Sequence, residues 1–506
     1  MNVTAERTTP IWGAPDIDAE PLQGDLETEV VVIGSGIAGM SVAYELASAG
    51  KQVTVLDRGV IAGGMTARTT AHLSSYSDDG FQELIKMRGL DNARGWQYSQ
   101  AAAISRIEAI QRDLGANCDF RRIDGYLFLA PETDPSVIDA ELVASAQVGM
   151  LAVRQEGLPF AGEEATPALR FPDQATFHPL KYLAALSTAI SKAGGRFFAF
   201  TPVVSVEEKN GGVDVATVGG AHIKAQSAVV ATNAPVNDRF SIHTKQAPYR
   251  TYAVAFEIPR GSVPDALYWD TLDPYHYVRL QPGEGGVDLL IVGGEDHKSG
   301  ESDNGQERIL SLARWMRERV PSLGQEVTRW SGQVLEPIDY IGFIGRNPGE
   351  KNVYVATGDS GQGMTHGAVA GMLIADLILR GDSAWAPIYE PGRKPLRAMG
   401  EFLKENATAA KNYAQYLTGA GERSSVDDLL PGEGAIIRSG LAKIAAYRDE
   451  DGTLCQRSAA CTHLGCQVHW NSFERCWDCP CHGSQFSPQG EVLNGPAISP
   501  LGKIES

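Results

Sequence analysis

The sequence has 506 residues, 43% of them hydrophobic and 21% charged, which is more chain than one ordinary domain needs and enough for several buried cores. Its 62 acidic and 44 basic residues give a net charge of −18, which argues against nucleic acid or an anionic membrane surface as a partner. No apolar run is long enough to span a membrane and no secretory pattern opens the chain, so the cytoplasm is the expected compartment.

Residues 1–28 have no hydrophobic periodicity and contain three prolines. Because proline interrupts helices and sheets, we expect irregular structure here. We expect an arm that lies on the first domain and is anchored by Trp12. A disordered tail is the alternative.

A dinucleotide-binding pattern begins at residue 29. It reads as a strand, a glycine-rich turn, a helix and a second strand that ends at Asp57. In such a βαβ unit Gly34 permits a tight turn, Gly36 lets the backbone approach a pyrophosphate, and Gly39 lets the helix pack on the strand. The helix N-terminus favours the pyrophosphate charge, and Asp57 accepts hydrogen bonds from a ribose. The complete βαβ context favours a dinucleotide site over a turn that binds no phosphate.

A loop of small and hydroxyl-bearing residues, 63–72, follows the second strand. Such a loop lets a flat cofactor lie against the backbone, and a flexible surface loop is the alternative. Its last residue, His72, is a candidate catalytic group or covalent cofactor anchor. A structural histidine with satisfied hydrogen bonds is the favoured interpretation.

Helices are expected at 81–115, at 135–148 and from about residue 180, where a proline occupies the first turn. Strands are expected at 125–129 and at 228–235, and a hairpin is expected from 197–206 and 213–218. The apolar strand at 228–235 suits the centre of a nucleotide-binding sheet.

Residues 245–340 alternate aromatic and β-branched residues, which predicts an antiparallel sheet with strands at 252–258, 275–280 and 287–292. Polar side chains near these aromatics are candidate substrate contacts, with surface charge or a satisfied hydrogen bond as the alternative for each. We expect four of them to orient the substrate: Arg250, His276, Tyr277 and Arg279. The other candidates are Tyr249, Glu295, Asp296 and His297.

A second glycine-rich turn, residues 358–367, follows a strand at 352–357 and precedes a helix at about 368–379. It again directs a helix N-terminus at an electron-rich group. A flavin ring gains negative charge at N1 and O2 when it is reduced, so a flavin is a fitting target.

An amphipathic helix over about 396–416 and a linker over 418–434, rich in glycine and serine, lead into the C-terminal region. Six of the seven cysteines crowd into this region, which favours a metal site. Cys461-x-His463 and Cys479-x-x-His482 supply two thiolates and two imidazoles. This set suits a [2Fe-2S] cluster with two cysteines on one iron and two histidines on the other. Tetrahedral zinc is the alternative, but zinc ribbons prefer paired Cys-x-x-Cys knuckles.

Residues of about 432–506 resemble Rieske proteins. The resemblance implies a loop-bridging disulfide between Cys466 and Cys481. Ser484 matches a serine that hydrogen-bonds cluster sulfur in high-potential members, whereas Phe486 stands where tyrosine is frequent. Because hydrogen bonds to the sulfurs stabilise the reduced cluster, we expect a potential below that of the respiratory-complex Rieske proteins. The implied cluster ligands are Cys461, His463, Cys479 and His482.

Residues of about 28–390 resemble the FAD-dependent D-amino-acid-oxidase-like family, on the first glycine motif, the threonine-rich loop and the late glycine-rich turn. The resemblance implies an α/β (α+β) fold: a Rossmann-type FAD domain with an antiparallel-sheet substrate domain, followed here by a small all-β Rieske domain. Arg68-Thr69-Thr70 stands where some members carry a covalent histidine, so non-covalent FAD is expected. The implied FAD contacts are Gly34, Gly36, Ile37, Ala38, Gly39, Asp57, Arg58, Thr66, Arg68, Thr69, Val204, Gly358, Gly361, Gln362, Gly363, Met364 and Thr365.

The expected domains follow from these motifs. They are the arm (1–28), the FAD-dependent oxidoreductase (29–417), the linker (418–434) and the Rieske domain (435–506). Within the oxidoreductase, FAD-binding parts are expected at about 29–80, 180–240 and 340–390, and substrate parts at about 81–179 and 245–340.

The predicted function is that of a flavin-dependent dehydrogenase. A small amine, an N-methyl amino acid or a related substrate, oxidised at CH–NH or CH–OH, gives a hydride to FAD. Electrons then pass singly to the cluster and to an external acceptor, such as a redox protein or a quinone. No second GxGxxG follows a strand, so NAD(P)H is not the expected donor. The alternatives are a flavin/Rieske reductase serving a partner oxygenase and an electron-carrier module without a substrate of its own.

Overall fold

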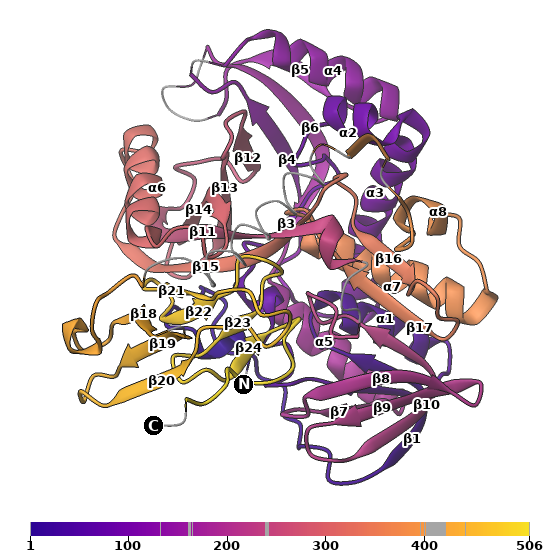
Figure 1. The fold of residues 1–506 in the computed structure, drawn as a ribbon. Coiled ribbons are helices and arrows are strands. Elements are labelled where there is room, and N and C mark those ends of the chain that lie inside the picture. Colours follow the sequence, from indigo (N-terminus) through magenta and orange to yellow (C-terminus); the bar gives the residue numbers. More distant parts are fainter. Residues whose placement is uncertain are drawn as a thin grey trace.

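A computed structural model describes residues 2–131, 133–159, 163, 165–237, 242–394, 396–398, 400, 421–440 and 442–504. Figure 1 shows three parts: a sheet that contains β1 and β10, a second large sheet that contains β11 and β14, and a small β domain near the C-terminus. The small domain, drawn in orange to yellow, lies beside both larger parts.

The first sheet has eight strands in the order β16-β17-β10-β1-β2-β7, with β8 and β9 attached at β10. Strands β17, β10, β1, β2 and β7 pair in parallel. Val30 and Val32 of β1 face the core shared with the helices, whereas Val31 and Ile33 face the core shared with the β8–β9 hairpin. Burial on both faces explains why β1 is a continuous apolar run. The strands are β1 (Leu26–Ile33), β2 (Val53–Leu56), β7 (Arg196–Phe198), β8 (Val203–Lys209), β9 (Gly212–Thr217), β10 (His222–Val230), β16 (Phe343–Arg346) and β17 (Val353–Thr357).

Three helices accompany this sheet: α1 (Ile37–Ser48), α5 (Pro179–Lys192) and α7 (Gly363–Arg380). The predicted hairpin of 197–206 with 213–218 is wrong at its beginning. Residues 196–198 form β7, which pairs in parallel with β2, and only β8 and β9 form the hairpin. The side-chain pattern did not show that the apolar positions of 197–206 belong to two strands with different partners.

The second sheet has nine strands in the order β15-β11-β14-β13-β12-β4-β6-β3, with β5 attached at β6. Its pairs are antiparallel except for β12 with β4. Helix α6 (Gly305–Arg319) packs on β11 and β14. The strands are β3 (His72–Leu73), β4 (Arg121–Phe128), β5 (Val153–Glu156), β6 (Pro167–Thr176), β11 (Gln246–Pro259), β12 (Leu267–Asp270), β13 (His276–Pro282), β14 (Val287–Lys298) and β15 (Glu326–Pro337).

Helices α2 (Phe81–Arg88), α3 (Leu90–Asp113) and α4 (Ser136–Val148) pack against one another beside this sheet. The single helix predicted at 81–115 is therefore two helices. Gly89, with a φ of 82°, ends the first and precedes the second. A positive φ is outside the helical region, so the chain changes direction there.

The C-terminal domain has two small antiparallel sheets. The first contains β18 (Gly434–Ser439), β19 (Ala442–Arg448) and β20 (Leu454–Ser458), and the second contains β21 (His469–Asn471), β22 (Cys476–Asp478), β23 (Gln485–Phe486) and β24 (Val492–Asn494). Part of the predicted linker packs on β18, since Glu422 N–H donates to the carbonyl oxygen of Ile436 at 2.7 Å and Leu429 is buried. The helix predicted at 396–416 lies almost entirely outside the described residues, which include only the short η4 (Leu396–Ala398) and residue 400 of it.

The N-terminal arm reaches both the second sheet and the small domain. Trp12 is buried and its indole N–H donates to the carbonyl oxygen of Thr69 at 2.6 Å, so the predicted anchor is confirmed. The backbone N–H of Arg7 donates to the carbonyl oxygen of Glu474 at 3.1 Å. The arm also contains the short η1 (Val3–Ala5).

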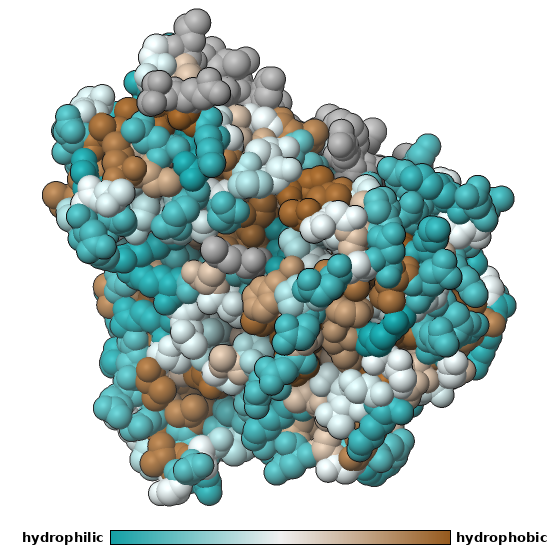
Figure 2. Space-filling model, turned by 90° about the horizontal axis from the view of Figure 1, so that it is seen from below, coloured by the Kyte–Doolittle hydropathy of each residue, from teal (hydrophilic) through white to brown (hydrophobic). Residues whose placement is uncertain are grey.

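Hydrophobic residues form scattered patches among hydrophilic ones on the face shown in Figure 2. No helix in the described part of the chain is both long and apolar enough to cross a membrane.

Candidate functional site

The first glycine-rich turn joins β1 to α1 with two close backbone approaches. Gly34 has a φ of 100°, and a Cβ on it would lie 2.3 Å from the carbonyl oxygen of Ala231. A Cβ on Gly39 would lie 1.9 Å from the carbonyl oxygen of Gly34. Any larger residue would push the helix away from the turn. Glycine thus holds the N-terminus of α1, with its free N–H groups, against the strand ends.

The second glycine-rich turn brings another helix N-terminus to the same place. Helix α7 begins at Gly363, directly after β17 and the turn. A Cβ on Gly367 would lie 2.9 Å from the backbone nitrogen of Ala38, and one on Gly371 would lie 2.7 Å from the Cβ of Ser41. These small residues let α7 cross α1 closely. Two helix N-termini therefore converge, and each favours negative charge.

A large cavity lies between the two turns, the loop of residues 64–78 and strands of the second sheet. Most of the predicted FAD contacts line it. Three do not: Gly39 packs on Gly34, Thr365 is buried within α7, and Val204 is replaced by its neighbour Val203. The lining members of the predicted set are Gly34, Gly36, Ile37, Ala38, Asp57, Arg58, Thr66, Arg68, Thr69, Gly358, Gly361, Gln362, Gly363 and Met364.

Asp57 and Thr66 organise the first turn from within. One carboxylate oxygen of Asp57 accepts from the backbone N–H of Ser35 at 3.0 Å and from its hydroxyl at 2.6 Å. The other oxygen accepts from the backbone N–H of Gly59 at 2.9 Å. The Thr66 hydroxyl accepts from the N–H of Ile37 at 2.9 Å. Asp57 thus shapes the loop and also lines the cavity, where its oxygens have capacity for further donors.

Arg68 lines the cavity but is held by ion pairs. Its guanidinium lies 3.0 Å from Glu6 and 2.7 Å from Glu474, and it donates to the carbonyl oxygen of Ser331 at 2.6 Å. These partners come from the arm, the small domain and the second sheet. The geometry indicates that Arg68 joins three parts of the protein, which the sequence motif did not suggest.

Of the four residues expected to orient a substrate, only Tyr277 lines the cavity. Arg250 is fully buried in ion pairs with Asp478, at 2.8 Å, and Glu6, at 3.3 Å. His276 pairs with Asp270 at 2.8 Å and stacks on Trp315. The expectation therefore needs correction for Arg250, His276 and Arg279, because none of the three lines the cavity and each is held by structural partners: Arg250 by Glu6 and Asp478, His276 by Asp270, and Arg279 by backbone carbonyl oxygens.

Arg279 points to the backbone beneath the loop that contains His72. Its guanidinium donates to the carbonyl oxygens of Thr70 and Ala71, each at 3.0 Å. Burial, together with this nearby cation, lowers the pKa of His72 to about 3. His72 is therefore neutral, and its ring packs edge-on against Tyr277 with centroids 5.2 Å apart. It lines the cavity as an uncharged wall residue.

The four predicted cluster ligands lie on two neighbouring loops of the small domain. Cys461 and Cys479 are buried and their thiols hydrogen-bond each other. The rings of His463 and His482 have centroids 5.0 Å apart. Burial lowers the pKa of His482 to about 3, which keeps its ring in the neutral form that binds iron.

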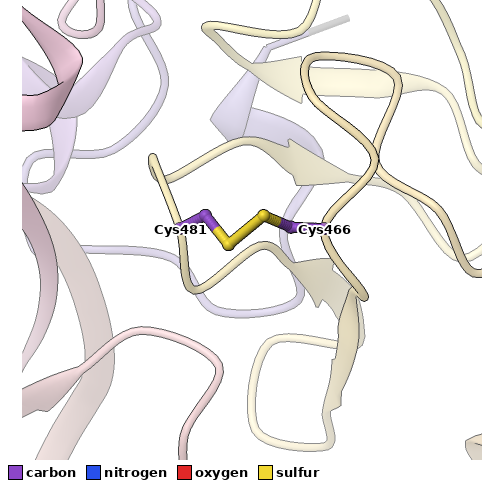
Figure 3. Close-up of a disulfide and its surroundings, with 2 residues drawn as sticks. All are labelled: Cys466 and Cys481. Atoms are coloured by element: carbon purple, nitrogen blue, oxygen red, sulfur yellow. A yellow bond between two sulfur atoms is a disulfide. The ribbon is translucent and has the colours of Figure 1, made fainter. Parts of the chain in front are cut away.

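The two loops are joined by the disulfide Cys466–Cys481, as the Rieske resemblance implies (Figure 3). Ser484 also hydrogen-bonds Cys461, one of the expected ligands, and its hydrogen bond to cluster sulfur stays a prediction. No three His, Cys, Asp or Glu side chains among the described residues lie close enough together to hold a single ion. A Rieske cluster makes a different demand, since each of its two irons takes two protein ligands. Two thiols and two imidazoles on adjacent loops fit that demand.

The cluster loops face the larger part of the protein. The ring of His243 lies 5.0 Å from that of His463 and 5.7 Å from that of His482, between centroids. Gln333 of β15 donates to the carbonyl oxygen of Gly483 at 2.9 Å and accepts from Asn494 at 2.8 Å. Gln333 and Asn494 both line the large cavity. Sequence reasoning missed these three residues, because their roles depend on how the two domains dock.

Comparisons with known proteins agree with this geometry. A family model described as FAD dependent oxidoreductase matches residues 29–377, and a Rieske [2Fe-2S] domain model matches residues 422–505. The putative Rieske 2Fe-2S iron-sulfur protein YhfW of Bacillus subtilis is 34% identical, over 96% of this chain and 94% of its own length. The gamma-glutamylputrescine oxidoreductase of Escherichia coli is 30% identical, over 75% of this chain and 93% of its own length.

Among solved structures, the glycine oxidase of Geobacillus kaustophilus superposes with a TM-score of 0.62. It covers 73% of this chain and 99% of its own, at 18% identity. At that identity the likeness establishes the fold. The mixed α/β fold with a separate all-β C-terminal domain is thereby confirmed.

Proposed function

The chain belongs to the FAD-dependent oxidoreductase family and ends in a Rieske [2Fe-2S] domain, and from this premise we propose that it is an amine dehydrogenase with a built-in one-electron outlet. FAD and a [2Fe-2S] cluster are its cofactors. Two relatives are named for amines as substrates, a gamma-glutamylputrescine oxidoreductase and a glycine oxidase, and these names support an amine as the substrate class. The proposal adds a small amine as the substrate and an external acceptor, a redox protein or a quinone, as the final electron sink. We place the reaction in the cytoplasm.

FAD supplies a hydride acceptor and the Rieske cluster supplies a one-electron carrier. The protein's own residues bind FAD and orient the substrate. The glycine turns at Gly34 and Gly361 bring backbone to the cavity, and the N-terminus of α7 favours negative charge there. His72, which is neutral, and Tyr277 line the same cavity.

The observation that carries the proposal is that the two redox sites share a wall. Leu493, Asn494 and Gly495 of the Rieske domain line the same cavity as both glycine turns. Gln333 links that wall to Gly483, next to the expected ligand His482. A carrier without its own substrate is the second candidate. The cavity continues to Trp269 and Tyr277 of the second sheet, and this space favours an enzyme.

The test is anaerobic mixing of the purified holoenzyme with a panel of primary, secondary and N-methyl amines. We expect at least one amine to bleach the flavin absorbance, followed by the electron paramagnetic resonance signal of the reduced cluster. If dithionite reduces both centres and no organic substrate does, the dehydrogenase proposal is wrong and the carrier is favoured.

The Gly39→Ala substitution is expected to weaken FAD binding. The new Cβ would lie 1.9 Å from the carbonyl oxygen of Gly34, so the turn and α1 must separate. Overpacking of this kind costs about 1–3 kcal/mol, which corresponds to roughly a 5- to 150-fold weaker Kd. The flavin absorbance per chain that remains after extensive dialysis measures how much FAD the variant retains.

Gly24→Ala is the matched control, because a Cβ at Gly24 meets nothing within 4 Å. This variant should retain its full flavin content. Equal flavin content in the two variants would contradict the assigned role of the turn.

A further inference from the structure

The side of the cavity away from the first turn is acidic. Asp78, Asp296 and Asp359 line it, and Asp79 and Glu336 lie directly behind, where the hydroxyl of Ser360 donates to Asp79 at 3.2 Å and to Glu336 at 2.8 Å. The Tyr275 hydroxyl donates to Asp78 at 3.0 Å. These five carboxyl groups are called the acidic wall below.

The acidic wall has little positive charge to balance it. The arginines that line the cavity are Arg58, which follows Asp57 at the first turn, and Arg68, which is held by Glu6 and Glu474. Among the described residues no lysine or arginine lines the wall itself. Arg308 acts on Asp296 from behind, where it also bonds Glu295.

Crowding and enclosure affect the protonation of these groups. Burial raises the pKa of Asp79 and Asp296 to about 7, and repulsion from Asp78 adds to both shifts. Burial and neighbouring carboxylates also raise the pKa of Glu336, and burial raises that of Asp359. Asp78 is the most accessible of the five, and its carboxyl group lines the cavity. A cation bound beside these carboxyl groups would favour their charged forms and so offset the upward pKa shifts.

Two hydrogen-bond acceptors beside the wall lack a donor among the described residues. The Oε1 atom of Gln362 is buried without a partner, whereas its amide nitrogen donates to the carbonyl oxygen of Tyr76. Gln362 as a whole is only 9% exposed and lines the cavity. One oxygen of Asp296 is also buried without a hydrogen bond, although Thr251 donates to that carboxyl group. Buried acceptors of this kind are normally satisfied. Gln362 is one of the expected FAD contacts, so the cofactor can supply its donor, and the open oxygen of Asp296 is the one that indicates a further ligand.

Aromatic rings complete the surroundings. Tyr76, Trp269, Tyr275 and Tyr277 line the cavity, and Tyr76 stacks on Trp269 with centroids 5.7 Å apart. The face of an aromatic ring attracts cations within about 6 Å. Carboxylates, open acceptors and rings together form a chemically consistent receptor for an alkylammonium group, which brings up to three N–H donors and a positive charge.

We propose that the substrate carries a second, positively charged amino group, as in a diamine or polyamine, and that the acidic wall binds this group while the other nitrogen is the one oxidised. The inference rests on the proposed amine dehydrogenase function and deepens it. An amino acid whose carboxylate entered this side would meet like charge, which costs binding energy instead of adding to it.

The experiment uses the holoenzyme and three linear amines of four carbons each. Butylamine, diaminobutane and aminobutanoate share one amino end and present a methyl, an ammonium or a carboxylate group at the other. We expect diaminobutane to bind roughly 10- to 100-fold more tightly than butylamine, as for a hydrogen bond to a charged group, and aminobutanoate to bind most weakly. Binding is read as the perturbation of the flavin absorbance, which needs no turnover, and anaerobic flavin reduction is followed in parallel.

Variants locate the effect. Asp78→Asn and Asp296→Asn keep shape and remove charge, so each should reduce the preference for diaminobutane over butylamine about tenfold. Asp113→Asn, at an exposed position on α3, is the matched control and should leave the preference unchanged.

The outcomes are separable. If aminobutanoate binds as tightly as diaminobutane, the cation inference is overturned even when amines are oxidised. If diaminobutane binds most tightly and loses that preference in the two aspartate variants, the inference holds even when none of the three compounds is oxidised, in which case the dehydrogenase proposal alone is in question.

Discussion

A Cys461→Ser variant is expected to lose the cluster and, with it, electron delivery to a protein acceptor, while the flavin is still reduced by substrate. Cys461 and Cys479 are the thiol pair on the two loops, and a hydroxyl is a poor substitute for a thiolate on iron. Iron and acid-labile sulfide should fall from two of each per chain to near zero. The rate of cytochrome c reduction should fall by about a hundredfold or more. Mutation of a residue that only hydrogen-bonds a metal ligand already costs about 10- to 100-fold in metal affinity or activity, and loss of the ligand itself costs at least as much.

Cys455→Ser is the matched control for this experiment. Cys455 lies in the same domain as a free, half-buried thiol and is not among the expected ligands. It should retain iron, sulfide and turnover. A wild-type protein that contains one zinc per chain and no sulfide would overturn the cluster assignment, and a Cys461→Ser variant that retains two irons would overturn the choice of ligand.

Replacing Arg250 by methionine is expected to destabilise the protein by about 3–5 kcal/mol, because it leaves buried carboxylates without their cation. Arg250 is fully buried and lies 2.8 Å from Asp478 and 3.3 Å from Glu6. The same cluster contains Arg68 and Glu474, 2.7 Å apart. Because these ion pairs join the arm, the second sheet and the Rieske domain, their loss should also loosen the docking of the Rieske domain.

The charges of these ion-paired residues explain why the loss of one arginine should lower stability so strongly. Two arginines face three carboxylates. Burial raises the pKa of Glu6 to about 7, so a proton on this residue can balance the set. The two arginines overcome the effect of burial at Glu474 and lower its pKa. At Asp478, Arg250 and hydrogen bonds from Asn471 and Gln485 overcome the effect of burial and lower the pKa. Without Arg250, a second carboxyl group would need a proton or would remain charged in the interior.

Denaturant unfolding of the holoenzyme measures the change. The matched control is Arg260→Met, which breaks an ion pair of 3.0 Å with Asp288 on the surface, where the arginine side chain is 53% exposed. Exposed pairs contribute only about 0–1 kcal/mol. If the Arg250→Met variant is as stable as this control, the ion pairs of Arg250 do not hold the domains together.

The local motifs were predictable because each depends on residues close together in the chain. The spacing of residues can be read directly from the sequence in three motifs: the turn at Gly34, the turn at Gly358 and the two Cys/His loops. Backbone geometry then determines which group each motif can bind. The fold class and both cofactors followed from these motifs and are confirmed. The domain boundaries stay predictions.

Substrate contacts were predicted poorly for an equally physical reason. Arg250, His276 and Arg279 occur on strands beside aromatic residues, as a substrate site would have them. The sequence does not say which face of a strand, or which part of its length, the cavity touches: His276 faces away from Tyr277, whereas Arg279 shares the face of Tyr277 and lies farther along β13. Arg250 instead faces Asp478 of the other domain, and Arg279 faces the backbone below His72.

The amino-acid sequence alone was sufficient for the two cofactors and the order of the domains, since short-range glycine, cysteine and histidine patterns encode them. Only the tertiary structure revealed that Gln333 links the cavity to the cluster loops and that five carboxyl groups gather on one side of that cavity. Those carboxyl groups come from a loop before α2, from β14, from β15 and from the turn after β17. Residues so far apart in the chain meet through packing of whole sheets, and packing of this kind leaves no local pattern in the sequence.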